Sequence, residues 1–546
     1  MTADVLFEGL YWLHCLVAGG LMLYGLNYYV LLATQQRFAV QMLPHDAALE
    51  REVPQTWPRV TVQLPIYNEQ YVLRRLVEAV VCLDYPREQL DIQILDDSTD
   101  ATTSLAARLV RQYRQQGCPI TLVHRQHRHG YKAGALQEGL ALARGEFIAI
   151  FDADFVPPAD FLRRLLPFFT DTRVGMVQSR WGHINRTYSL LSLAQSIGID
   201  GHFWVEQAAR CWAGWFMNFN GSGGIWRRRT IEDVGGWQAD TLTEDLDLSY
   251  RAQLRGWRCK FVPQVVCPAE LPVQMSGVKS QQHRWAKGSI QTALKLLPRL
   301  LRAPLPLLTK VQGVYHLTNY LVHPLMLGLA LTTPVLLQGG ALFTAPMSLL
   351  TCVAIAGATC APSSVYLYTQ HRLYPGWYRR PWGFLALLVL GTGIALSNTR
   401  AVLEAVFQVQ SPFVRTPKFR IEQGSDTWRG KHYNAPFNAP FPWLSLGEVT
   451  LGLYSASGLL LAWQRGVYGV LPFQLLYTLG FLSVAGLSLW EYGQRYHMTL
   501  LPQPEAVRPS AAVEDNGHHA QPTPAPPAGL SPQPAAYGKP PAGRSS

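Results

Sequence analysis

The chain has 546 residues, a formal net charge of +11 and 48% hydrophobic residues. This length accommodates a domain of ordinary size together with several membrane helices, although composition alone establishes neither. The eight cysteines form no C-x-x-C pair and no zinc-like spacing. We therefore expect reduced, structural thiols rather than a disulfide framework or a zinc site.

Several long segments contain no Asp, Glu, Lys or Arg, namely residues 9–36, 311–371, 381–399, 449–464 and 466–490. Spanning a bilayer needs about 20 mainly apolar residues. The first segment therefore predicts one span, the second two spans, and the last two a tight helical hairpin. The continuous apolar core of 381–399 is shorter than a span, which fits a re-entrant or interfacial helix better. About five spans plus interfacial helices are expected.

Basic residues near the ends of the spans predict the orientation. No Lys or Arg precedes the first span, whereas the loop HRLYPGWYRRP is basic. The segment 37–308 is therefore expected in the cytosol of a multi-pass protein of the inner or plasma membrane. The first apolar run is too long for a cleaved signal, so a signal anchor is expected. The positive charge suits a lipid bilayer and anionic substrates, and we expect no nucleic acid partner.

Between the first and second spans, short β-branched runs alternate with amphipathic stretches. RVTVQLPIYN, LDIQILDDS and GEFIAIFDAD predict strands, and helices are expected at about 70–82, 102–115 and 131–143. This alternation predicts an α/β domain with a mostly parallel sheet covered by helices on both faces. Ligands of such sheets bind beyond the carboxyl ends of the strands, where this sequence places its acids.

Two further helical stretches and the C-terminal tail have distinct compositions. The amphipathic segment 187–210 predicts either a core helix or a helix on the membrane surface, and we favour the surface. Residues 279–302 predict a basic amphipathic helix on the membrane, with no acid opposing its cations along the segment. From Leu501 onward eleven of forty-six residues are proline, so this tail is expected to be disordered.

Three sites carry candidate chemistry. Asp152 and Asp154 follow the third predicted strand at i and i+2, so they are expected to point the same way and share a hard divalent cation, although a lone D-x-D more often marks a loop or cap. Lys132 lies at a glycine-bounded helix start, where an ammonium group and the helix N-terminus can hold a diphosphate, unless it is a surface lysine. In TEDLDL the acids can cap a helix, or Asp245 can deprotonate an acceptor hydroxyl.

Seven segments occur in one order along the chain: LPIYNE, LDDSTD, GYKAGAL, FDADF, NFNGSGG, TEDLDL and QQHRW. This order and spacing resemble the membrane glycosyltransferases of family 2, which include cellulose, chitin and hyaluronan synthases. The amino-acid sequences of these motifs are most similar to those of the cellulose-synthase-like A group of mannan and glucomannan synthases. The resemblance covers residues 58–300 strongly and implies a GT-A type, Rossmann-like catalytic domain inserted between transmembrane helices. It also implies inverting sugar transfer with a divalent cation, Mg²⁺ or Mn²⁺.

The resemblance assigns roles to individual residues. Donor-nucleotide binding is implied for Tyr67, Glu69, Asp97, Lys132 and Arg284. Metal binding is implied for Asp152 and Asp154, base catalysis for Asp245, and acceptor-glycan binding for Glu244, Gln281 and Trp285. The family's gating loop, F-x-V-T-x-K, maps onto Phe413, Thr416 and Lys418, with Arg415 where the pattern has valine. An indole suits the apolar face of a sugar, but Trp285 is also a candidate interfacial anchor.

These expectations divide the chain into seven parts. They are a transmembrane helix at 1–36, a cytosolic GT-A domain at 37–277, an interfacial helix at 278–308, two transmembrane helices at 309–371, a re-entrant helix and gating loop at 372–441, two transmembrane helices at 442–492, and a disordered tail at 493–546.

The expected function is a processive synthase of a β-linked polysaccharide, either β-1,4-mannan, glucomannan or glucan. It would use GDP-mannose or UDP-glucose, extend a nascent glycan acceptor and translocate the product across the membrane. One alternative is a lipid glycosyltransferase of the ceramide type that makes a single transfer, and a less favoured one is a transporter that binds nucleotide sugars. The polar positions His316, Asn319, His323 and Glu448 are candidates to line a path, although Glu448 is also expected to face headgroups.

Overall fold

In this computed structural model the described residues are 3–52, 54–339, 345–411, 415–431, 433 and 441–500. Phe413 of the predicted gating loop lies outside them, as does the predicted tail from residue 501. Helix α17 (Leu471–Leu500) continues through residues 493–500, which the sequence assigned to the tail. That part of the tail prediction is therefore wrong, because the helix does not end where its apolar window ends.

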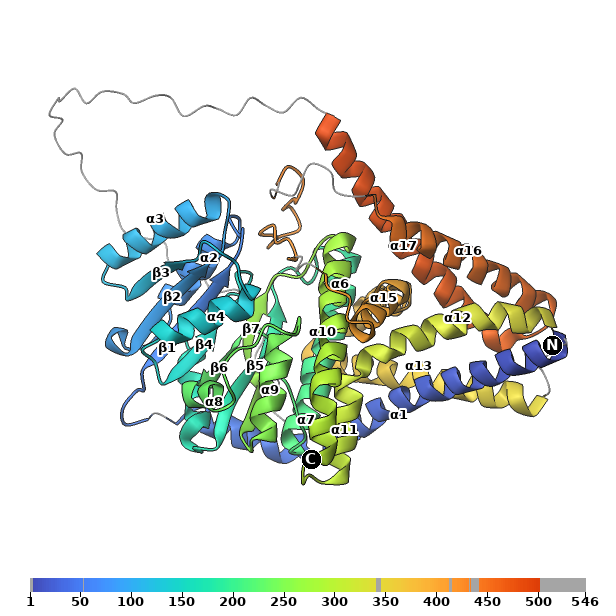
Figure 1. Cartoon of the computed structure of the whole chain (residues 1–546), viewed down its shortest axis with the longest axis horizontal. Helices are drawn as coiled ribbons and strands as arrows, with labels where there is room; N and C mark the ends of the chain where they lie inside the picture. Colours follow the sequence, from blue (N-terminus) through green and yellow to red (C-terminus); the bar gives the residue numbers. More distant parts are fainter. Residues whose placement is uncertain are drawn as a thin grey trace. The chain divides into compact units, whose positions relative to one another are not determined.

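A seven-stranded mixed sheet forms the centre of the domain that follows α1 (Figure 1). The strands are β1 (Val60–Ile66), β2 (Leu90–Asp96), β3 (Ile120–His124), β4 (Phe147–Ile150), β5 (Val174–His183), β6 (Gly224–Arg227) and β7 (Arg258–Ala269). Their order is β3-β2-β1-β4-β6-β5-β7, and β6 is antiparallel to both of its neighbours while the other pairs are parallel. The predicted mostly parallel sheet and its three predicted strands, β1, β2 and β4, are confirmed.

Helices cover both faces of this sheet because its strands are apolar on both sides. Val62 of β1 and Ala149 of β4 belong to the core under α2 (Leu73–Val81). Ile148 of β4 belongs to the opposite core. The other helices of this domain are α3 (Ala101–Gln115), α4 (Tyr131–Leu142), α5 (Phe161–Leu165), α8 (Arg228–Asp233) and α9 (Glu244–Leu254), with short 3-10 turns η1 (Arg87–Gln89) and η2 (Leu166–Thr170).

The stretch 187–210 forms one helical run with a π-helical centre. Its parts are α6 (Leu190–Gly201), η3 (His202–Gln207) and α7 (Ala208–Trp212). Phe203 and Ala208 belong to the core beneath the sheet, while α6 packs against α13 (Ala345–Leu373) and α14 (Pro381–Gly393). The run is enclosed by the chain on both sides. The structure thus favours the core helix over the membrane-surface helix, because apolar partners from later in the chain cover its second face.

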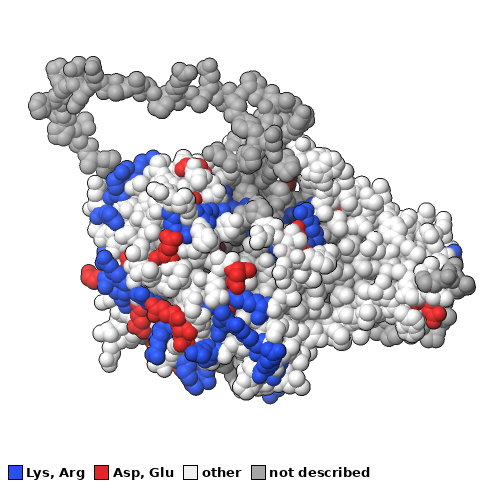
Figure 2. All heavy atoms as spheres, viewed as in Figure 1, with Lys and Arg blue, Asp and Glu red and all other residues white. Residues whose placement is uncertain are grey.

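Several helices are long and apolar enough to cross a membrane by length and composition. Among the described residues they lie within α1 (Ala3–Leu49), residues 319–339 with α12 (Val322–Gly339), α16 (Trp443–Gln464) and residues 468–494 with α17. The pair α14 and α15 (Ala395–Val406), bent by 43°, would be a fifth if it forms one span. Figure 2 shows few charged side chains over these helices and many over the sheet domain. The sequence predicted two spans within residues 311–371, and α13 corresponds to the second of them. Because α13 is not among these candidates, the predicted count of five spans stays a prediction.

Both ends of the bent pair contact the sheet domain. Before the pair, the Arg186 guanidinium lies 3.7 Å from the centre of the Tyr374 ring. After it, Lys418 forms an ion pair with Asp154. A segment whose two ends meet the same domain is what a re-entrant hairpin requires, so this geometry favours the prediction that residues 382–408 return to the side they entered.

Helix α10 (Met275–Arg302) includes the predicted basic stretch, but its cations are not unopposed. Lys279 pairs with Glu448 at 2.7 Å, Lys287 with Glu404 at 3.2 Å, and Lys295 with Asp247 at 2.8 Å. No acid of the segment itself opposes these cations, as expected, but acids from other parts of the chain do. Glu448 is fully buried in this pair and faces neither headgroups nor a path. The remaining elements are α11 (Leu307–Leu317), η4 (Asn319–Leu321), η5 (Trp377–Arg379) and η6 (Tyr468–Val470).

The crossing of α14 and α17 depends on two glycines. A Cβ added at Gly480 would lie 2.4 Å from Thr392 Oγ1 and 2.9 Å from the Gly393 nitrogen. Small residues allow such close approach between apolar helices. We expect Gly480→Ala to lower the thermal unfolding midpoint in detergent by several degrees, because overpacking typically costs about 1–3 kcal/mol.

Gly486→Ala on the same helix is the matched control, because nothing lies within 4 Å of its added Cβ. Equal midpoints for the two variants would contradict this close packing of α14 against α17.

Candidate functional site

A cavity of about 200 Å³ opens beyond the carboxyl ends of β1, β2 and β4. Every predicted site residue that the structure describes lines it, and these are Tyr67, Glu69, Asp97, Lys132, Asp152, Asp154, Glu244, Asp245, Gln281, Arg284, Trp285, Thr416 and Lys418. We call it the donor cavity. Residues separated by up to 351 positions in sequence thus meet at one edge of the sheet. Their chemical roles remain predictions that this geometry motivates.

The two D-x-D acids lie in a turn rather than on a strand. Strand β4 ends at Ile150, and the Asp152 amide donates to the Ser222 hydroxyl at 2.9 Å. The Asp152 carbonyl accepts from the Phe155 amide at 3.0 Å. The expectation that strand alternation aligns Asp152 and Asp154 was therefore wrong in its reason. The turn nevertheless brings both carboxylates to the donor cavity.

Each of these carboxylates is paired with a lysine. The Lys132 ammonium lies 2.6 Å from Asp152, and the Lys418 ammonium lies 2.6 Å from Asp154. Burial raises the pKa of Asp152, an effect that Lys132 opposes. Within the described residues no group of three or more His, Cys, Asp or Glu forms a preassembled metal site. Two carboxylates fit a hard cation such as Mg²⁺, which completes its shell with water and phosphate oxygens.

Lys132 is fixed at the N-terminal end of α4. The helix follows Gly130, whose φ of 68° is in the left-handed region that glycine adopts without strain. Lys132 Nζ also donates to the Gly221 carbonyl at 2.8 Å and lies 3.9 Å from Glu244. Burial alone would lower the Lys132 pKa, but Asp152 and Glu244 raise it overall, so this ammonium stays charged beside the acids.

Two arginines that the sequence interpretation missed also meet the predicted nucleotide residues. Arg125 holds Asp97 through two hydrogen bonds of 2.6 Å. The Arg128 guanidinium lies 3.5 Å from the centre of the Tyr67 ring and 3.9 Å from Asp97. The available signal was the basic run RQHRH before Lys132, but the run alone does not tell which cation faces the cavity.

Asp245 lies in the first turn of α9 but does not cap it in the ordinary way. The Thr243 N-cap residue makes no side-chain cap hydrogen bond, and Asp245 Oδ1 accepts from the Leu246 amide at 2.8 Å. Burial, followed by the charge of Glu244, raises the Asp245 pKa to about 7. A carboxylate with such a pKa is suited to general base catalysis near neutral pH. The nearby Asp247 is instead fully buried with Arg251 and Lys295.

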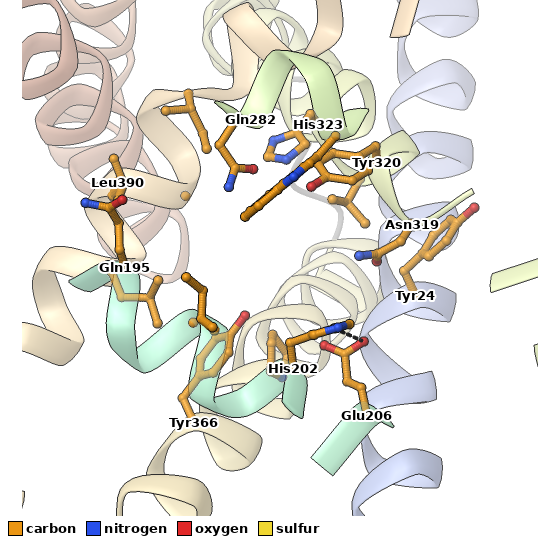
Figure 3. A pocket seen from close by; sticks show the side chains of 18 of the residues that line it. Tyr24, Gln195, His202, Glu206, Gln282, Asn319, Tyr320, His323, Tyr366 and Leu390 are labelled. Atoms are coloured by element: carbon orange, nitrogen blue, oxygen red, sulfur yellow. Dashed lines mark ion pairs between the residues drawn. The ribbon is translucent and has the colours of Figure 1, made fainter. Parts of the chain in front are cut away.

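A second cavity of about 480 Å³ lies among the apolar helices and shares residues with the donor cavity. We call it the chamber, and Figure 3 labels part of its wall: Tyr24, Gln195, His202, Glu206, Gln282, Asn319, Tyr320, His323, Tyr366 and Leu390. Predicted path residues His316, Asn319 and His323 line it, whereas Glu448 does not. The residues common to both cavities are Trp181, Ile199, Asn220, Thr243, Asp245, Gln281 and Trp285.

The spacing of α10 explains why its motif faces both cavities. Gln281 and Trp285 are separated by four residues, so they lie on one face of the helix. Arg284 lines the donor cavity only, and its guanidinium donates to the Thr416 hydroxyl at 2.9 Å. Burial lowers the Arg284 pKa to about 10, opposed by Asp152 and Glu244.

The π-helix η3 places an ion-paired group in the chamber. His202 Nδ1 lies 3.8 Å from Glu206 Oε2 (Figure 3). Arg210 pairs with the same carboxylate at 3.1 Å. Burial opposes ionisation of Glu206, but His202 and Arg210 lower its pKa to about 2. The chamber wall therefore carries an ionised carboxylate that can accept hydrogen bonds from hydroxyl groups.

The raised pKa of Asp245 predicts a pH-dependent stability. An unfolded aspartate loses its proton near pH 4, whereas folded Asp245 keeps it until about pH 7. Between these values the folded state binds more protons, so this residue makes stability fall as pH rises. We expect the thermal midpoint of Asp245→Asn to exceed that of the wild type increasingly from pH 4 to 7, and by a constant amount above.

Asp171→Asn is the control in which stability should change in the opposite direction, because hydrogen bonding lowers the Asp171 pKa. That variant is expected to lose stability at neutral pH. A lower midpoint for Asp245→Asn than for the wild type at pH 8 would contradict the raised pKa of the Asp245 carboxylate.

Comparisons with known proteins match the part of the chain that contributes most residues of the donor cavity. Residues 58–288 match the family described as "Glycosyltransferase like family 2". Glucomannan 4-beta-mannosyltransferase 1 of Oryza sativa subsp. japonica is 38% identical over 251 residues, which are 45% of this chain and 48% of the relative. The protein of that name from Cyamopsis tetragonoloba is 38% identical over 265 residues, 47% of this chain and 50% of the relative. The chain spans about half the length of the curated relatives it matches.

Among solved structures, the mannosyltransferase PcManGT from Pyrobaculum calidifontis in complex with GDP-Man and Mn²⁺ is 21% identical. The match has a TM-score of 0.44 and covers 71% of this chain and 100% of that one. Because this structural similarity is low, the comparison with known families rests on the sequence matches. The match to glycosyltransferase-like family 2 is confined to residues 58–288, and over about this region the chain is similar to glucomannan 4-beta-mannosyltransferases.

Proposed function

We propose that this protein is a membrane-integrated glycosyltransferase that extends a β-linked glycan from a nucleotide sugar. The observation that carries the proposal is the place of Asp245, which lines both the donor cavity and the chamber. A base at this junction would meet an acceptor hydroxyl arriving from one cavity and an anomeric carbon presented in the other. Similarity to the glucomannan 4-beta-mannosyltransferases favours GDP-mannose as the donor over UDP-glucose.

The proposed reaction is a one-step displacement. A sugar hydroxyl is a weak nucleophile near pH 7, so the Asp245 carboxylate accepts its proton as the oxygen bonds to the anomeric carbon. The bond from that carbon to the diphosphate oxygen breaks, and its electron pair leaves with the diphosphate. Attack from the opposite side inverts the carbon and converts an α-linked donor into a β-linked product. No covalent glycosyl-enzyme intermediate is required.

The leaving diphosphate needs positive charge around it. Lys132 and Arg284 line the donor cavity and keep their cationic forms at neutral pH, so they would bind its oxygens. A divalent cation held by Asp152 and Asp154 would supply further charge neutralisation when bound. Asp97 and Tyr67, held by Arg125 and Arg128, would contact the nucleoside.

The chamber supports a glycan as the acceptor. Trp285 and Gln281 form part of the boundary between the two cavities, and a flat indole with an amide matches the apolar and hydroxyl faces of a sugar ring. Beyond them the wall carries His202, Glu206 and Asn319. Such a wall would bind successive sugars, which favours processive synthesis and passage of the product between the helices.

A single transfer to a lipid is the second candidate function. Part of the chamber wall is apolar and comes from helices that are candidates to span the membrane, namely Leu387, Leu388, Leu390, Phe473, Leu476 and Tyr477. An acyl chain would fit this side. The size of the product distinguishes the two functions.

The first test is incorporation of labelled sugar by the purified full chain in detergent, comparing GDP-mannose with UDP-glucose. We expect long product from GDP-mannose that a β-mannanase digests, and loss of activity when EDTA removes Mg²⁺ or Mn²⁺. Asp245→Asn should lower the rate by about 10²–10⁴-fold, the range for a general base. A lipid-soluble product with one or two sugars would refute the polymer synthase.

A glycine tests the geometry around the base. Gly221 has a φ of 79°, and an added Cβ would lie 3.0 Å from Asp245 Oδ2 and 3.4 Å from Lys132 Nζ. We expect Gly221→Ala to reduce kcat at least about tenfold, because small displacements of catalytic groups are costly.

Gly214→Ala is the matched control for backbone strain, because Gly214 has a φ of 70° and open space around its Cβ position. If both variants lost activity equally, strain rather than the position of Asp245 would be responsible.

A further inference from the structure

The segment 415–418 is attached to the donor cavity by contacts to three different elements. Arg415 pairs with Glu69 at 2.5 Å, Thr416 accepts a hydrogen bond from Arg284, and Lys418 pairs with Asp154. Lys418 also donates to the Glu270 carbonyl at 2.6 Å. These contacts place two cations of the segment beside acids that follow β1 and β4.

Arg415 is the residue of this segment that departs from the valine of the family pattern. Its guanidinium lies 4.3 Å from the centre of the Tyr433 ring, and its side chain is 15% exposed. Burial would lower its pKa, but Glu69 raises it, so the group stays cationic. A planar cation fixed between an aromatic ring and a carboxylate has few rotamers left to lose when it binds a ligand.

Among the described residues, three guanidinium groups line the donor cavity: Arg128, Arg284 and Arg415. Burial lowers the pKa of Arg128 and of Arg284, and the nearby charge of Arg415 adds to the lowering of both. Like charges held together in a partly buried space favour an anionic ligand, and guanidinium groups bind phosphate oxygens in a bidentate manner.

Glu69 is an incomplete partner for Arg415. The carboxylate is buried, and burial raises its pKa to about 7 even though Arg415 opposes this. Its Oε2 atom is buried without a hydrogen-bond partner among the described residues. A carboxylate satisfied on one oxygen only is a counter-ion that a doubly charged phosphate group can replace.

We propose that Arg415 is a donor-binding residue that exchanges Glu69 for the diphosphate of the nucleotide. The proposal rests on the proposed function and adds to it a cation beyond Lys132 and Arg284. Glu69 then holds Arg415 in the donor-free state. Because Arg415 and Lys418 belong to one short segment, binding of the diphosphate draws both cations toward the same ligand.

The test is calorimetric binding of GDP and of UDP to the purified full chain in detergent with Mn²⁺. Arg415→Val, which restores the residue of the family pattern, is expected to weaken the affinity for GDP by about tenfold or more, as loss of a charge-assisted contact does. Arg415→Lys keeps the charge but not the fork, so its affinity should lie between those of valine and wild type. Thermal midpoints of all variants establish that they are folded.

Two further variants sharpen the outcome. Arg429→Val removes an exposed cation of the same region, outside the donor cavity, and should leave GDP affinity within about twofold. The resemblance implied donor binding for Glu69, but its pairing with Arg415 makes it a competitor of the diphosphate in this proposal. Glu69→Gln should therefore tighten GDP binding, whereas weaker or unchanged binding would overturn the exchange.

The failures of the two proposals are distinguishable. A wild-type chain that binds neither GDP nor UDP would refute the glycosyltransferase itself. A wild-type chain that binds GDP, with Arg415→Val binding equally well, would refute the role of Arg415 and leave the proposed function standing.

Discussion

The pairing of buried charges at the carboxyl edge of the sheet is the constraint on which the rest of the site depends. Acids and cations from several loops share the donor cavity, and a buried charge is tolerated when it has a partner. Lys132 with Asp152 and Lys418 with Asp154 are the central pairs. They hold together the acids that the proposed reaction needs and keep them from repelling one another. A diphosphate and a divalent cation carry charges of both signs, so they can replace these partners without leaving a buried charge alone.

Helix α10 connects the donor cavity to the apolar helices. Its Gln281 and Trp285 form the boundary between the donor cavity and the chamber, while Lys279 binds Glu448 of α16 and Lys287 binds Glu404 of α15. Breaking a buried ion pair by removing one partner is strongly destabilising. The position of the Q-x-x-R-W motif is therefore set by the helices that carry the chamber. Donor site and chamber are parts of one packed structure, which suits an enzyme that would hand its product from one cavity to the other.

The same site also contains a carboxylate that lowers the stability of the fold. Asp245 is buried beside Glu244, and its pKa is raised to about 7, so its ionised form opposes folding at neutral pH. The surrounding core is extensive, and the proposed reaction needs this carboxylate where the acceptor would arrive. Gly221 shows a corresponding steric constraint, since its φ is positive and an added Cβ would lie 3.0 Å from Asp245 Oδ2, so that the carboxylate would have to shift. Stability and the proposed catalysis thus make opposite demands on these positions.

The sequence by itself determined the local elements and the order of the chemical motifs. Periods of two and of 3.6 residues predicted β1, β2, β4 and α2 to α4, because those periods depend on near neighbours. The tertiary structure decided which groups meet. Asp152 and Asp154 come together through a turn, Arg128 stacks on Tyr67, and α6 is covered by helices from residue 345 onward. Contacts of this kind depend on packing between distant segments, and a single chain's periodicity carries no record of them.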